Sequence, residues 1–164
     1  MEQHIRKIRT TLAEETGLIG QMLELAEQTR EALVHRDMNS LNSIGAKQQT
    51  LMMRLDLVRQ TQERLSAQLR EELGDSAPAP ETGIKGLLKH LRAGEEMLQL
   101  GVLETKLCDL AAYNAANEKL LEKQFQSLNA FQQLVDLVSG NQKVYDRSGS
   151  VNTRRSGSRI EHQR

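Results

Sequence analysis

The stretch Leu100–Val138, "LGVLETKLCDLAAYNAANEKLLEKQFQSLNAFQQLVDLV", places a core-type residue at alternating intervals of three and four. This spacing gathers side chains on one face of an α-helix and is typical of coiled coils. The pattern runs for more than five heptads without a slip, so it predicts one long helix packed along partner helices. Its positions are Leu100, Leu103, Leu107, Leu110, Asn114, Asn117, Leu121, Gln124, Leu128, Phe131, Val135 and Val138.

Two earlier segments have the same spacing. Residues 3–35 carry it from Ile5 to Leu33, with the polar Glu15 and Thr29 at two of the core-type positions. Residues 38–73 carry it from Leu41 to Leu69. Asp37 lies between the two segments and is a suitable N-cap, because its carboxylate can accept the free amides of a first turn. The short connection predicts that the two helices form an antiparallel hairpin.

The segment "GDSAPAPETG", Gly74–Gly83, is the clearest connection in the chain. Gly74 suits the left-handed position that ends a helix, and Pro78 and Pro80 prevent the helix from resuming. Thr82 can cap a short helix over about 84–92. A break at Gly94 then precedes the last long helix, which we expect over about 95–139.

The expected fold class is therefore all-α. We expect an elongated antiparallel coiled-coil bundle of three long helices with one short connecting helix, over residues 1–139. Aromatic residues make up only 2% of the chain, and its many unbranched side chains favour helices over sheets. Residues 140–164 lack a helical stripe and are expected to be a flexible tail. Six basic residues in this tail exceed two acidic ones, so it carries a charge of about +4 and the remainder about −4.

The last helix is longer than its expected partners. At a rise of about 1.5 Å per residue it spans roughly 65 Å against roughly 50 Å for each of the others. Its C-terminal end is therefore expected to extend past them, and its apolar face widens there. Such a face is either a partner-binding site or is covered by the short helix or by a second protomer. The residues of the widened face are Leu128, Phe131, Leu134, Val135, Leu137 and Val138.

The sequence contains no arrangement typical of catalysis. Nucleotide-binding and zinc-protease motifs are absent, and the four histidines lie without a metal-ligand spacing. The single cysteine, Cys108, lies within helical periodicity and is expected to be a buried structural thiol. We therefore expect no enzyme, no catalytic residue, no metal and no cofactor.

Two further partner classes are also not expected. The basic segment "NTRRSGSR", 152–159, has no basic helix face and no stacking aromatic beside it, which argues against nucleic acid. No segment reaches the roughly 20 apolar residues of a membrane span, so stable membrane insertion is not expected. No secretory leader is recognisable either, and we expect a cytoplasmic protein.

Asn114 and Asn117 occupy core-type positions of the last helix. Buried asparagines cost stability and fix the register of packed helices, and Gln48 and Gln62 are possible partners at core-type positions. The alternative is that the bundle opens at this level and the amides are hydrated.

Three motifs give the chain a family resemblance. They are "NAANEKLLE" at 114–122, the Tyr-x-x-x-Gly element within "VYDRSGSV" at 144–151, and, less specifically, "IGAKQQTLMMRL" at 44–55. In their order and spacing the sequence resembles the FlgN-type flagellar type III export chaperones.

The resemblance implies a cytoplasmic chaperone that binds the C-terminal helical regions of the hook–filament junction proteins FlgK and FlgL. It also implies delivery of this cargo to the export gate protein FlhA, through a docking element at Val144, Tyr145 and Gly149. The free protein is expected to be a monomer or a homodimer, and a structural coiled-coil scaffold is the alternative function. The implied cargo-binding residues are Leu121, Phe125, Leu128, Phe131, Leu134, Val135, Leu137, Val138 and Val151.

Overall fold

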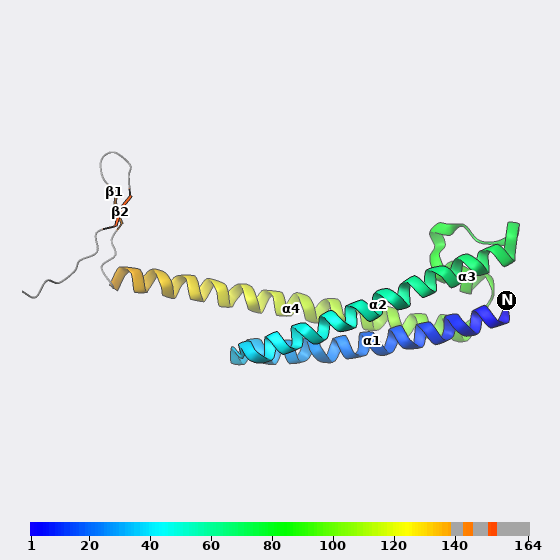
Figure 1. The fold of residues 1–164 in the computed structure, drawn as a ribbon, viewed down its shortest axis with the longest axis horizontal. Coiled ribbons are helices and arrows are strands. Elements are labelled where there is room, and N and C mark those ends of the chain that lie inside the picture. Colours follow the sequence, from blue (N-terminus) through cyan, green and yellow to red (C-terminus); the bar gives the residue numbers. More distant parts are fainter. Residues whose placement is uncertain (139–142, 146–150, 154–164) are drawn as a thin grey trace, which may run out of the picture. The chain divides into compact units, whose positions relative to one another are not determined.

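The structure is a computed structural model, and it describes residues 1–138, 143–145 and 151–153. Long helices pack against each other in an all-α bundle (Figure 1). The chain divides into two compact units, Met1–Leu120 and Leu121–Arg164, whereas the sequence analysis places a boundary after residue 139. The helices are α1 (Glu2–His35), α2 (Met38–Leu73), α3 (Gly83–His90) and α4 (Gly94–Val138).

Helices α1 and α2 form an antiparallel hairpin and run side by side in Figure 1. His4 near the start of α1 lies 2.9 Å from Glu72 near the end of α2. The turn is stabilised by Asp37, whose Oδ1 accepts the backbone amides of Asn39 and Ser40 at 3.1 Å each. The Ser40 hydroxyl donates to Asp37 Oδ2 at 2.6 Å, and this bond lowers the pKa of the Asp37 carboxyl. The predicted N-cap is therefore confirmed.

The first part of α4 packs on this hairpin, parallel to α1. Arg9 of α1 binds Glu96 of α4, and further along both helices Ala26 accepts a hydrogen bond from Asn117. Leucines of α4, Leu100 and Leu103, join the same hydrophobic core as residues of α1 and α2. Because all three helices supply the core, the bundle is held together by burial along its whole interface. The most deeply buried large side chains of the first unit are Ile8, Leu12, Ile19, Leu69, Leu87 and Leu88.

The connection between α2 and α4 contains two 3-10 turns, η1 (Gly74–Ser76) and η2 (Pro80–Thr82), followed by α3. Gly74 ends α2 with a positive φ of 52°, as expected for a glycine that stops a helix, but its ψ of −131° lies outside the left-handed helical region, so the predicted left-handed conformation is wrong. The expected cap by Thr82 is wrong: its hydroxyl donates to the Ala79 carbonyl at 2.7 Å and makes no capping bond to α3. That hydroxyl also packs where a side chain of Gly86 would stand, so Gly86 must lack a Cβ.

Cys108 is exposed on α4, so the expectation of a buried thiol is wrong. Heptad spacing gives the average direction of a helix face, and Cys108 follows the core-type Leu107 directly. Successive residues are about 100° apart on a helix. Cys108 is thereby turned out of the interface on which Leu107 is half-buried.

The second unit contains two short strands that the sequence analysis did not predict. Strand β1 (Lys143–Tyr145) pairs antiparallel with β2 (Val151–Thr153), and Tyr145 is the direct partner of Val151. Valine, tyrosine and threonine favour extended backbone. A strand of three residues is too short to show a clear alternation of polar and apolar side chains, so the sequence pattern did not predict β1 and β2.

Candidate functional site

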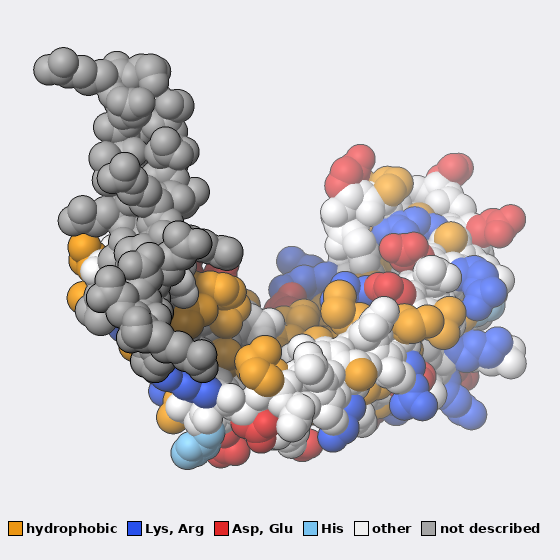
Figure 2. Space-filling view, turned by 60° about the vertical axis from the view of Figure 1, so that its left-hand side comes forward, with side chains coloured by type: hydrophobic (Ala, Val, Ile, Leu, Met, Phe, Trp, Pro, Cys, Tyr) orange, Lys and Arg blue, Asp and Glu red, His pale blue; other side chains and the backbone are white. Residues whose placement is uncertain are grey.

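The second half of α4 carries a row of exposed apolar side chains. Between 40% and 63% of each side chain is accessible to solvent, a large fraction for leucine, valine and phenylalanine. Figure 2 shows hydrophobic side chains gathered on the surface of this part of α4, which precedes the residues drawn in grey. We call this row the α4 stripe, and its members are Leu121, Phe125, Leu128, Phe131 and Val135.

The α4 stripe covers one side of the helix. At about 100° per residue its five members fall within an arc of roughly 120°, the width expected for a helix face that packs on a partner. Leu134 lies about 60° beyond the Phe131 edge of this arc, so it stands outside the stripe. Leu137 is 71% exposed but lies on the opposite side of the helix from Leu121, so it does not extend the same face.

From Leu121 to Val135 the α4 stripe is about 21 Å long at the standard helical rise. That length matches about four turns of a second helix lying along it. An exposed, regular apolar face of this kind is suited to recognition of another amphipathic helix. Of the remaining predicted cargo-binding residues, Val138 ends α4 and Val151 begins β2.

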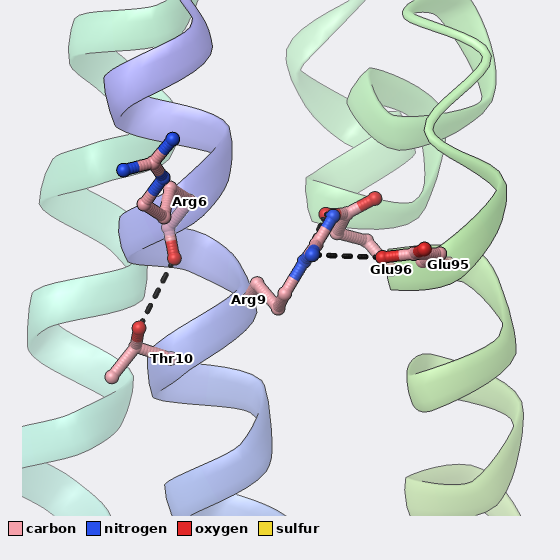
Figure 3. Close-up of polar contacts among 5 residues, drawn as sticks. All are labelled: Arg6, Arg9, Thr10, Glu95 and Glu96. Carbon is pink, nitrogen blue, oxygen red and sulfur yellow. Dashed lines mark hydrogen bonds and ion pairs between the residues drawn. The ribbon is translucent and has the colours of Figure 1, made fainter.

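The start of α4 is fixed to α1 by a charged cluster (Figure 3). Arg9 Nε and Nη2 both lie 2.7 Å from Glu96 Oε1, and Arg9 Nη1 lies 2.8 Å from Glu95. Glu96 is buried, so its charge needs this partner. The hydrogen bond to Glu96 raises the pKa of Arg9 above its usual value, which keeps the guanidinium charged. Figure 3 also shows Thr10 donating to the Arg6 carbonyl within α1.

Asn117 provides the second polar contact between α4 and α1. Its Nδ2 donates to the backbone carbonyl of Ala26 at 2.8 Å, and the side chain is 7% exposed. Its Oδ1 is buried without a partner among the described residues. Asn114 is exposed, so its predicted core position is wrong. The partner of Asn117 is a backbone carbonyl rather than Gln48 or Gln62.

Gln62 instead completes a polar layer within the α1–α2 hairpin. Glu15, one of the two polar interruptions in the first helical pattern, is buried there. It accepts hydrogen bonds from Arg59 Nε at 3.2 Å and from Gln62 Nε2 at 2.9 Å. Sequence reasoning found both polar positions but did not join them. An acid and an amide at core-type positions of neighbouring helices could have suggested the pair.

The predicted docking residues lie in the second unit. Val144 and Tyr145 belong to β1, and Gly149 lies outside the described residues. Tyr145 pairs in register with Val151, which the sequence analysis assigns to cargo binding. The strand pairing therefore places one predicted docking residue directly opposite one predicted cargo-binding residue.

The described part of the chain was also considered as a possible metal centre and as a possible membrane-spanning protein. Across residues 1–138 and the two strands, no group of three or more His, Cys, Asp or Glu side chains is placed to hold a metal ion. Over the same residues, no helix combines the length and the apolar character needed to cross a membrane.

The last helix of this bundle presents an exposed apolar stripe, a surface suited to binding another helix. The family model described as "FlgN protein" matches residues 1–153, which includes α4 and both strands. The chain therefore belongs to the FlgN family, a family of flagellar export chaperones that bind hook-associated proteins and not a known enzyme family. No curated protein and no solved structure matches the chain.

Proposed function

We propose that this protein is a substrate-specific cytoplasmic chaperone of flagellar type III secretion. In this proposal it binds the hook–filament junction proteins FlgK and FlgL before export and prevents their premature assembly. It then delivers them to the export gate protein FlhA. The observation that carries the proposal is the α4 stripe, an apolar helix face left bare in a chain that belongs to an export chaperone family.

The α4 stripe suits cargo whose own terminal helices await assembly. Such helices expose apolar faces until they meet their partners in the filament, and a second apolar helix can cover them. Full burial of a leucine or phenylalanine side chain contributes about 1.5–3 kcal/mol, so the half-exposed residues of the stripe each contribute roughly 1 kcal/mol. Five of them supply roughly 5 kcal/mol, and burial of the apolar face of the cargo helix supplies about as much again, before the cost of association, so the complex is expected to be of modest affinity and to release at the membrane.

Delivery is assigned to the β-hairpin of the second unit. We propose that Tyr145, with Val144 and Gly149, contacts the export gate. Strand β1 is only three residues long, and a short two-stranded hairpin contributes little to the stability of a fold, which favours a docking role for Tyr145 over a structural one. Val138 and Val151 are proposed to extend the cargo-binding surface beyond the α4 stripe.

The stripe is tested by Phe131→Ser in the full chain, with Leu98→Ser as a matched control. Phe131 is 63% exposed in the stripe, and Leu98 is 74% exposed elsewhere on α4. Loss of the Phe131 contact, worth roughly 1 kcal/mol, should weaken binding of the C-terminal helical fragments of FlgK and FlgL about fivefold. Calorimetric titration measures this. Equal affinities of Phe131→Ser and the control would remove the stripe from the cargo site.

The alternative function is a coiled-coil scaffold in which the α4 stripe packs on a second copy. Light scattering with and without cargo separates the two functions. A chaperone should be a monomer or dimer that forms a defined complex with the cargo fragment. A large oligomer that persists unchanged when cargo is added would favour the scaffold.

A further inference from the structure

A second exposed surface lies on the α1–α2 hairpin, away from α4. Arg9 and Gly20 mark the side of α1 that faces α4, through Glu96 and the Lys106 side chain respectively. At about 100° per residue, Thr11 and Leu18 lie roughly 180–200° around the helix from Arg9. They therefore line a groove between α1 and α2 on the opposite side of the hairpin.

This α1–α2 groove is formed by two adjoining hollows with volumes of about 420 and 450 Å³. They share Thr11 and Thr61, so they form one continuous depression. Leu18, Val58 and Leu65 in its lining are buried, while Leu57 at its edge is 64% exposed. From Arg54 to Gln68 the groove extends along α2 for about 21 Å, the length of a helix of four turns.

An exposed apolar side chain continues along the edge of the groove on α2. Met53 is 65% exposed and precedes Leu57 by about one turn on the same side of the helix. Methionine adapts its shape to different partners, and it is common on surfaces that bind helices. Met53 falls within the motif "IGAKQQTLMMRL", for which the proposed cargo and gate contacts have no use.

The groove has an excess of positive charge. Lys7, Arg54 and Arg64 line it, against the single acid Glu14. None of the three basic side chains forms an ion pair or side-chain hydrogen bond within the described part of the chain. Two other arginines of this unit, Arg9 and Arg59, are paired with acids. The unpaired cations therefore favour a partner that brings carboxylates.

We propose that the α1–α2 groove is a second docking site, which binds an acidic amphipathic helix of a partner protein. The apolar face of that helix covers Leu57 and the buried floor at Leu18 and Val58. Carboxylates on its flanks pair with Lys7 and Arg64 at one end and with Arg54 near the other. The residues of this site lie wholly within the first unit, and none of them belongs to the α4 stripe.

The test uses the full chain and two helix-stabilised, fluorescent 14-residue peptides. Both have leucine on one face; the acidic probe has glutamate along its flanks, and the basic probe has lysine at the same positions. Fluorescence anisotropy should show the acidic probe binding at least tenfold more tightly at low salt, with the difference shrinking as salt screens the charges. Equal affinity for the two probes, or no binding of either, would overturn the proposal.

Variants locate the probe. Leu57→Ser should weaken the acidic probe at least fivefold, whereas Leu98→Ser on α4 should not. Reversing Lys7 and Arg64 to glutamate should exchange the preference between the probes, whereas Arg30→Glu, an exposed position outside the groove, should not. If Leu57→Ser instead dissociates a dimer without any probe, the groove binds a second copy and the proposal is wrong. Phe131→Ser should leave probe affinity unchanged, so failure here is separate from failure of the cargo site.

Discussion

Replacing Asn117 by leucine should stabilise the protein. The two side chains have the same branched shape, so leucine fits the 7%-exposed site without a cavity. The substitution loses the hydrogen bond to Ala26, worth about 1 kcal/mol. It also removes the buried Oδ1 that has no partner among the described residues, which costs about 1–3 kcal/mol in the native protein. Burial of the leucine adds about 2 kcal/mol.

The net effect is a gain of about 2–4 kcal/mol, because the Ala26 carbonyl still lies within α1 and keeps the acceptor role of a helical carbonyl. For a unit of this size the unfolding midpoint should rise by about 4–16 °C. Circular dichroism at 222 nm during heating measures it. Asn114→Leu is the control, because Asn114 is exposed three residues earlier on the same helix.

A lower midpoint for Asn117→Leu than for the unchanged protein would refute this reasoning. It would mean that Oδ1 is satisfied in solution, for example by a buried water, and that the asparagine is a net stabilising residue. An equal rise in both variants would instead point to a general effect of helix propensity rather than to burial.

Three shorter predictions concern the cap, the thiol and the hairpin. Asp37→Ala should lower the unfolding midpoint at pH 7. The pKa of Asp37 is lowered in the folded state by the Ser40 hydroxyl, so its stabilisation is present above the unfolded pKa of about 3.9 and lost as pH falls through the folded value. The difference between variant and unchanged protein in urea unfolding should therefore vanish at low pH. Cys108 is exposed, so a maleimide should label it in the folded protein nearly as fast as in urea, and slow labelling would indicate a buried thiol. Tyr145→Ala should impair FlhA binding in a pull-down and leave cargo affinity nearly unchanged; equal loss of both would place Tyr145 in the cargo site.

Local sequence signals predicted the helical parts well. The spacing of three and four residues indicated α1, α2 and α4, and the observed ends differ from the expected ones by about one residue. Asp37 and Gly74 each carry a local physical signal, a side-chain acceptor and a permitted positive φ, that does not depend on the rest of the fold.

The pattern failed where the orientation of a helix face mattered. Leu103, the half-buried Leu110 and the buried Asn117 follow one another at intervals of seven, as the pattern predicts. Between the last two, however, Tyr113 is half-buried and Asn114 is exposed. Spacing alone cannot decide between two adjacent positions, because the choice depends on how the neighbouring helices pack at that level.

Tertiary contacts decided the remaining errors. The Thr82 hydroxyl binds Ala79 rather than α3 because the preceding 3-10 turn offers a nearer acceptor. The pairing of β1 with β2 joins residues on either side of a five-residue connection. The sequence indicated only weakly that the residues of β1 and β2 prefer an extended backbone, and it did not predict which residues pair across the two strands.

The two polar contacts of α4 also bear on the order in which the chain folds. Helices α1 and α2 are neighbours in sequence, whereas Arg9–Glu96 and Ala26–Asn117 join residues about 90 positions apart. Closing the longer loop is slower, so α4 should dock after the hairpin has formed. A docking error of one heptad would keep leucines opposite leucines. It would, however, leave the buried Glu96 carboxylate without Arg9 and separate Asn117 from the Ala26 carbonyl. Together these losses would cost several kcal/mol of stability. We therefore predict that Glu96 and Asn117 disfavour a slipped α4 during assembly of the bundle.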